Sequence, residues 1–271
     1  MKGATMFRIP SVVILGLALF APLAASAADT PTQKTSAAGA QPEKSDESLK
    51  RMISSNNLKQ LALGMEVFAS AHKRFPAAAI RDANGKPLLS WRVEILPYIE
   101  QKDLYTQFRL DEPWDSEHNK ALLAKMPAIF RGPYIDAGST NAAYFVPTGK
   151  GMFAGDDQGK RFKDITDGTS RTIMLIEAKR EIPWTKPEDI EIDPDSAKPL
   201  PTFGFPQAGG VFVVAFADGS VKKVADTIDP KLLRELLTVA GGEAIPPEAV
   251  SQAVIGREDP KPVGREPIPP R

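Results

Sequence analysis

The residues best suited to chemistry form one acidic and aromatic string, 111–118, which reads Asp-Glu-Pro-Trp-Asp-Ser-Glu-His. Sugar-active sites combine paired carboxylates with aromatic rings, because one acid protonates the leaving group while the other supports the developing positive charge. Such a site would use Trp114, Asp115 and His118, together with Trp91. The alternative, which the spacing favours, is that Asp115 caps a helix, that Trp114 packs against the fold and that the other acids are solvated.

A second acidic group lies in a glycine-rich stretch and consists of Asp156, Asp157, Asp164 and Asp167. Calcium takes several oxygen ligands from flexible loops, so these aspartates are candidate calcium ligands, although their spacing does not fit an EF-hand loop. Turn formation and capping by aspartate explain the same residues without a metal. Apart from calcium, the sequence predicts no cofactor.

Signatures of catalysis are otherwise missing from the sequence. The chain has two histidines, His72 and His118, and no Gly-x-Ser-x-Gly string that could supply a nucleophile. His72 continues an apolar helical stripe, so we expect it to be structural. The string 155–160 has the wrong spacing and two acids too many for a phosphate-binding loop. We therefore expect a protein that is not an enzyme.

The first 27 residues have the three zones of a secretory signal peptide. Two basic residues precede an uncharged apolar run over 12–20, and small residues precede a cleavage site between Ala27 and Ala28. The run is shorter than the roughly 20 residues of a spanning helix, and the alternative is a leader retained as an anchor. We expect an exported chain, periplasmic or extracellular, without a membrane span after cleavage.

The charge balance narrows the possible partners. The chain has 34 basic and 34 acidic side chains, and removal of residues 1–27 leaves a net charge of about −2. A nucleic-acid partner would need a strong basic excess, so none is expected. There is no cysteine, so the fold depends on its core alone.

Two polar segments flank the part that can fold. Residues 28–47 contain no aromatic side chain, and residues 257–271 contain five prolines. Neither can bury enough apolar surface to offset the entropy of ordering, so we expect a flexible linker and a disordered tail. The folded domain is accordingly expected over residues 48–256.

Helical patterns dominate the first half of this domain. The clearest helix is expected over 48–73, where Leu58, Leu61, Met65 and Phe68 recur at steps of three and four. Shorter helices are expected over 91–98, 100–108 and about 117–125, with Ser90 capping the first and Asp115 or Ser116 the last. Asn84-Gly85 predicts a tight turn.

Beyond residue 127 the pattern changes to strands. The best hairpin joins the runs 210–217 and 220–224 through Asp218-Gly219, and further strands are expected over 142–146 and 172–177. The proline-rich segment 181–207 is expected to be irregular, with Trp184 pinning it. A last helix is expected over 231–239, capped by Asp229. Helices first and strands later predict an α+β domain with an antiparallel sheet.

Several strings resemble one known family. They read Asn56-Asn57-Leu58-Lys59-Gln60, Leu88-Leu89-Ser90-Trp91-Arg92, Leu96-Pro97-Tyr98-Ile99-Glu100-Gln101, Asp164-Ile165-Thr166-Asp167-Gly168-Thr169-Ser170 and Phe216-Ala217-Asp218-Gly219-Ser220. Together they resemble a large family of planctomycete proteins known as domain of unknown function 1559, over about residues 54–242. The resemblance implies a pilin-like fold, with a long N-terminal helix on an antiparallel sheet. It implies no reaction, since no activity is established for that family.

Two departures from the family pattern stand out. Relatives begin with a prepilin-type leader, which an ordinary signal peptide replaces here. Relatives also often carry a cysteine just before the Asn-Asn-Leu-Lys-Gln string and another near Pro133, where this chain has Ser54-Ser55 and Arg131-Gly132. The resemblance thus implies the loss of two cysteines.

Two hypotheses follow. The first is an exported, non-enzymatic interaction module of the cell envelope, with an envelope protein or a glycan as partner. The second is a periplasmic protein that binds or processes carbohydrate through Trp91, Trp114 and the acids beside them.

Overall fold

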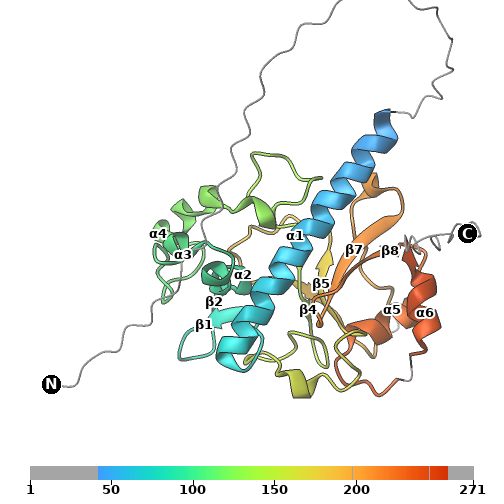
Figure 1. Ribbon diagram of the computed structural model, residues 1–271. Helices are drawn as coiled ribbons and strands as arrows, with labels where there is room; N and C mark the ends of the chain where they lie inside the picture. Colours follow the sequence, from blue (N-terminus) through green and yellow to red (C-terminus); the bar gives the residue numbers. More distant parts are fainter. Residues whose placement is uncertain (1–41, 197, 244, 256–271) are drawn as a thin grey trace, which may run out of the picture. The chain divides into compact units, whose positions relative to one another are not determined.

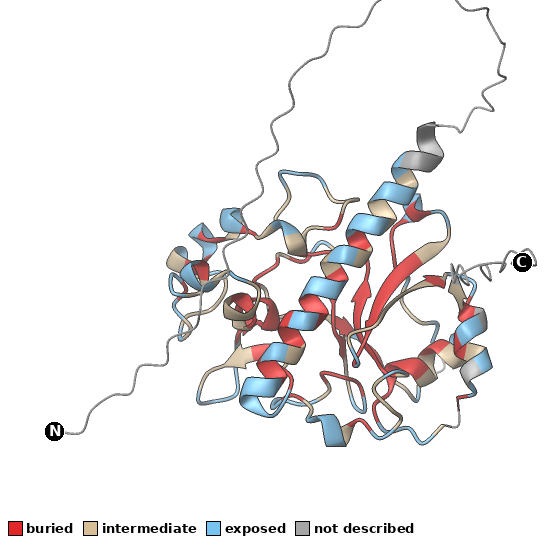
Figure 2. Ribbon diagram, viewed as in Figure 1, coloured by how far each residue is buried: buried red, intermediate tan, exposed pale blue. Residues whose placement is uncertain are grey.

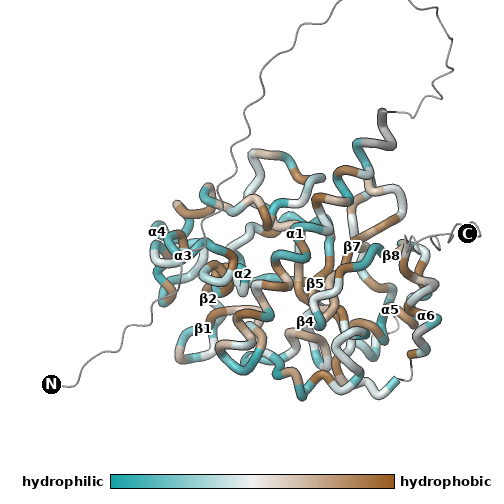
Figure 3. Tube along the Cα trace, viewed as in Figure 1, coloured by the Kyte–Doolittle hydropathy of each residue, from teal (hydrophilic) through white to brown (hydrophobic). Residues whose placement is uncertain are grey.

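The computed structural model describes residues 42–196, 198–243 and 245–255. Its first element is α1, a helix of 31 residues over Pro42–His72. Hydrophobic and hydrophilic residues alternate along it (Figure 3), and Leu58, Leu61 and Met65 are wholly buried, as the helical spacing predicts. The helix begins six residues earlier than expected, so the end of the predicted linker is helical. It ends where Lys73 adopts a positive φ of 63°.

The main sheet has five antiparallel strands in the order β3-β5-β7-β8-β9. The strands are β3 (Tyr144–Phe145), β5 (Ile173–Glu177), β7 (Val211–Phe216), β8 (Val221–Ala225) and β9 (Val254–Ile255). The predicted hairpin is confirmed as β7 and β8, which pair with Phe212 opposite Val224. Gly219 in its turn has a φ of 75°, which a residue with a side chain rarely adopts.

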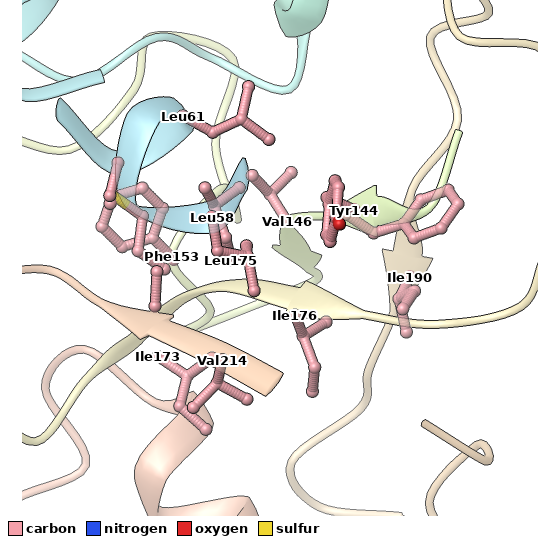
Figure 4. Close-up of a cluster of buried hydrophobic side chains, with 14 of the residues drawn as sticks. Leu58, Leu61, Tyr144, Val146, Phe153, Ile173, Leu175, Ile176, Ile190 and Val214 are labelled. Carbon is pink, nitrogen blue, oxygen red and sulfur yellow. The ribbon is translucent and has the colours of Figure 1, made fainter. Parts of the chain in front are cut away.

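The helix α1 lies across this sheet and contacts β5, β7 and β8 (Figure 1). Figure 4 shows Leu58 of α1 beside Leu175 of β5 within one cluster of buried side chains. Burial of such side chains is the main favourable contribution to folding, at about 25 cal/mol per Å² of apolar surface. The predicted fold class is confirmed: the domain is α+β, with its N-terminal helix packed on an antiparallel sheet.

A hairpin and several short helices follow α1. The hairpin pairs β1 (Ala79–Arg81) with β2 (Pro87–Ser90). The helices are α2 (Trp91–Glu94), η1 (Leu96–Tyr98), α3 (Lys102–Tyr105), α4 (Glu117–Ala121), η2 (Leu123–Lys125) and η3 (Ala128–Phe130). Ser90 caps α2 as predicted, since its hydroxyl accepts a hydrogen bond from the Arg92 amide. The helix expected over 91–98 is divided, because Pro97 has no amide hydrogen with which to continue it.

The proline-rich segment contains one short strand that the sequence did not predict. The strand β6 (Ile190–Glu191) pairs in parallel with β4 (Pro147–Thr148). Trp184 pins the segment as expected: it is wholly buried, and its Nε1 donates to the Leu123 carbonyl oxygen at 3.1 Å. Two further short 3-10 helices are present: η4 (Phe162–Asp164) precedes β5, and η5 (Pro206–Ala208) lies at the end of the proline-rich segment, before β7.

Two helices and the short strand β9 are the last described elements. Asp229 caps α5 (Pro230–Leu237) as predicted, and α6 (Pro247–Ala253), which was not predicted, leads into β9. The predicted leader 1–27 and tail 257–271 lie outside the described residues. Among the helices that are described, none is long and apolar enough to span a bilayer.

Candidate functional site

The predicted carbohydrate residues differ in their exposure. Trp91 is wholly buried, and its Nε1 donates to Asp189 Oδ1 at 3.2 Å, so it has no face to offer a ligand. Trp114 is half-buried with the Lys186 ammonium 5.9 Å from its ring centre. Asp115 is exposed, and His118 Nε2 lies 2.8 Å from the Gln107 carbonyl oxygen. The cap of α4 is Ser116 rather than Asp115.

The four candidate calcium ligands each have other partners. Asp156 pairs with Lys160, Asp157 with Arg81, and Asp164 with Arg161. Asp167 accepts from the amides of Gly241 and Gly242 at 2.7 and 3.0 Å. Within the ranges that the structure describes, no three His, Cys, Asp or Glu side chains gather so that they could hold a metal ion. The geometry of these aspartates therefore gives the calcium expectation no support.

A buried ion pair fixes the start of the proline-rich segment. Arg92 and Asp189 are 2.8 Å apart, with side chains 0% and 1% exposed. The guanidinium also donates to the Tyr144 carbonyl oxygen, and Asp189 Oδ1 accepts from the Val146 amide. Burial raises the pKa of Asp189, and the Arg92 charge opposes that shift. The pair ties the segment to the edge of the main sheet beside β3.

A second buried polar cluster joins α1 to β5. The Ser54 hydroxyl donates to Glu177 Oε1 and lies 3.0 Å from the Tyr144 hydroxyl. Burial raises the pKa of Glu177 to about 7, against the hydrogen bonds from Ser54 and the Val213 amide. A Cβ at Gly132 would lie 3.6 Å from the same Tyr144 hydroxyl. The two neighbourhoods for which the resemblance implies a lost cysteine, Ser54-Ser55 and Arg131-Gly132, therefore both lie close to the Tyr144 hydroxyl.

A mainly apolar pocket lies between the proline-rich segment and the helix α5. This cleft, which we call the 196–234 cleft, has a volume of about 670 Å³, within the usual range for small-molecule sites. Its floor consists of buried apolar side chains from three separate parts of the chain, namely Phe203, Phe212, Ile228 and Leu233. The Phe203 and Phe212 rings lie 5.6 Å apart.

The rim of the cleft is polar and carries more positive than negative charge. Lys198 and Arg234 contribute two cations, and Asp226 contributes one carboxylate. Arg234 donates to the carbonyl oxygens of Asp193 and Lys198, so it holds the rim segment against α5. The Lys198 side chain is exposed at the rim. Such a cleft is suited to a small ligand that combines an apolar body with an acidic group.

Three prolines stiffen the wall of this cleft. Pro199 and Pro201 line one side, and Pro230 begins α5 on the other. Their fixed φ angles reduce the ordering cost of binding. Sequence reasoning missed the cleft because its residues come from segments that are far apart in the chain. The one signal in the sequence was the run 198–203, in which two prolines alternate with Leu200 and lead into Phe203.

Comparison with known protein families gives a match to one part of the chain. Residues 47–134 match the model of the family SBP_bac_10, described as a protein of unknown function (DUF1559). No curated protein and no solved structure matches the chain. The matched segment covers most of α1, the first hairpin and the short helices through η3, and it ends before the 196–234 cleft. Over residues 47–134 the chain is therefore similar to the DUF1559 family of proteins of unknown function.

Proposed function

We propose that this chain is an exported, non-enzymatic binding module of the cell envelope, with a pilin-like fold, and that it binds a small acidic ligand with an apolar body in the 196–234 cleft. The single observation that carries this proposal is the cleft itself, with its buried floor of Phe203 and Phe212 beneath a cationic rim. The apolar floor would supply most of the affinity, and the charges would orient the ligand.

The expectation of export is supported by the pattern of residues 1–27, and the pilin-like description by the long helix on an antiparallel sheet. Export has a direct test. The chain recovered from outside the cytoplasm of its host should begin at Ala28, as N-terminal sequencing or intact mass would report. A recovered chain that still begins at Met1 would contradict cleavage.

The binding proposal is tested with two matched fluorescent probes. One is 8-anilinonaphthalene-1-sulfonate, which combines an aromatic body with a sulfonate, and the other is N-phenyl-1-naphthylamine, which lacks the sulfonate. We expect saturable binding of both, with the sulfonate bound more tightly. Lys198→Glu should weaken binding of the sulfonate probe by about tenfold, which is the effect of losing one charge-assisted contact. It should weaken binding of the neutral probe far less.

Two further variants locate the site. Leu200 lines the cleft and is half-buried, so Leu200→Asp should weaken both probes while the fold persists. Phe162 is 47% exposed and does not line the cleft, so Phe162→Ser is the matched control and should change neither affinity. If all variants bound both probes with the same affinity as the wild type, the probes would bind outside the cleft and the proposal would be wrong.

A further inference from the structure

The outer face of α1 carries an apolar stripe that nothing in the described part of the chain covers. Leu49, Met52, Ile53, Leu63 and Val67 are 39–59% exposed, although α1 packs its opposite face on the sheet. Figure 2 shows the exposed residues along this outer side of the helix. Between residues 49 and 67, all of which are described, Lys59 is the one charged residue in the exposed class, and Lys50, Arg51 and Glu66 are partly exposed. A solvated helix face normally carries many charges, so this face is typical of an interface.

The spacing of the stripe is that of a coiled-coil seam. It runs at alternating steps of four and three residues, which is the heptad pattern of two helices packed along each other: Leu49, Ile53, Asn56, Gln60, Leu63 and Val67. The two amides occupy the centre of the seam, and apolar residues occupy both ends. Polar residues at single seam positions are known to fix the register of paired helices.

The seam is also self-complementary about its centre. If a second copy of the helix lies antiparallel, with the two-fold axis crossing the outer face at the level of residue 58, Leu49 faces Val67 of the other copy and Ile53 faces its Leu63. Asn56 then faces Gln60, and the two amides can hydrogen-bond. An isologous dimer requires this kind of symmetry, in which one surface patch matches itself.

The helix dipoles favour the antiparallel over the parallel arrangement. In an antiparallel pair the positive end of each dipole lies beside the negative end of the other. In a parallel pair like ends would lie side by side. The charges in the first described turns do not decide between the two arrangements, because Lys50 pairs with Asp46 and Glu47.

We infer that the outer face of α1 is a self-association surface on which two copies of this chain pair antiparallel. The seam spans about 27 Å of helix at 1.5 Å per residue. One helix face of this length buries less than the roughly 800 Å² per partner of a standard interface, so the dimer is a weak one, with a dissociation constant on the order of micromolar. This surface lies away from the cleft residues and does not depend on ligand binding there.

The test is sedimentation velocity on the full chain over a range of concentrations, with charge-swapped variants. Ile53→Lys and Leu63→Glu each place one charge in the seam, and each should raise the dissociation constant at least tenfold. Both positions are exposed, so both variants should fold, as their melting temperatures would report. A mixture of the two variants should associate again, because Lys at 53 then faces Glu at 63 across the antiparallel seam.

The control mixture combines Val67→Lys with Leu63→Glu, which face different residues in this register. It should remain monomeric where the first mixture associates. Recovery in both mixtures, or association that neither single variant weakens, would overturn the inference. The inference would also be overturned if the wild-type chain stayed monomeric up to about 100 μM, a concentration at which a dimer with a micromolar dissociation constant would be mostly formed.

Discussion

Glu177 is a residue at which burial and charge conflict. Its carboxyl group lies on the central strand β5, is nearly inaccessible to water and has a pKa of about 7 in place of 4.5. Between pH 4.5 and 7 the folded chain therefore holds a proton that the unfolded chain has lost. Stability falls as pH rises through this window, because the folded state binds more protons there, and it stays reduced above pH 7.

Glu177→Gln should remove this dependence. The glutamine amide nitrogen can donate to the Ser54 oxygen, in place of the bond that Ser54 donates to Glu177, and the amide oxygen can accept from the Val213 amide, so the fold should persist. The free energy of unfolding, measured by urea titration at several pH values, should fall less between pH 4.5 and 7 than in the wild type, by on the order of 3 kcal/mol.

A second titrating group sets the baseline for that comparison. Burial also raises the pKa of Glu94 to about 7, and its contribution remains in both proteins. The prediction therefore concerns the difference between variant and wild type. Identical pH profiles for the two proteins would show that Glu177 is ionised in the folded chain throughout.

Arg92 illustrates the cost of breaking a buried ion pair. Its removal would leave the Asp189 carboxylate buried without its cation, and Asp189 Oδ2 already has no hydrogen-bond partner among the described residues. Arg92→Met should cost about 3–5 kcal/mol of unfolding free energy. Adding Asp189→Asn should recover part of the loss, because it removes the unpaired charge.

The matched control is Arg109→Met, which breaks an exposed ion pair to Glu112. It should leave the urea midpoint unchanged, since such pairs are screened by water. Should Arg92→Met behave like this control, the buried pair would contribute nothing to the fold.

At the scale of elements, three predictions from local patterns succeeded. The stripe around Leu58 and Met65, the Asp218-Gly219 turn and the cap at Ser90 are each read from a few neighbouring residues, and the structure confirms all three. Strand β6 has only two residues and pairs with a partner about 40 residues earlier, so its formation depends on tertiary contacts that no local pattern reports.

Gly149 tests how the pairing of β4 with β6 is held. It has a φ of 112°, and a Cβ there would lie 2.2 Å from the Ile192 carbonyl oxygen. Gly149→Ala should destabilise the chain by about 1–3 kcal/mol through backbone strain. It should also speed hydrogen exchange at the Ile192 amide, which donates to the Thr148 carbonyl oxygen at 2.8 Å.

Gly138→Ala is the control for this change. Its φ is not positive, and no described atom lies within 4 Å of the added Cβ. It should be neutral in both measurements. Unchanged exchange at Ile192 in the Gly149 variant would mean that the loop relaxes without loss of the strand pair.

At the scale of the whole molecule, the candidate site was not predictable. Among the residues singled out from the sequence, Trp91 and the four aspartates contribute to the core, to ion pairs and to turns. The cleft arises where the proline-rich segment meets β7 and α5, and the Arg92–Asp189 pair that fixes this segment joins residues 97 positions apart. Only the folded chain brings these parts together.

The cleft and the outer face of α1 are two apolar surfaces that compete as binding sites for any apolar ligand. They differ in charge: the cleft has a cationic rim at Lys198 and Arg234, whereas the exposed class of residues between 49 and 67 on the helix includes one charge, Lys59. An acidic ligand should therefore choose the cleft.

The most direct test is a chemical-shift titration of the ¹⁵N-labelled chain with 8-anilinonaphthalene-1-sulfonate. If the probe binds in the cleft, the largest chemical-shift changes should fall on the amides of four residues that line it, Thr202, Phe203, Phe212 and Leu233. Shifts concentrated on the outer face of α1, with the cleft amides unchanged, would contradict it.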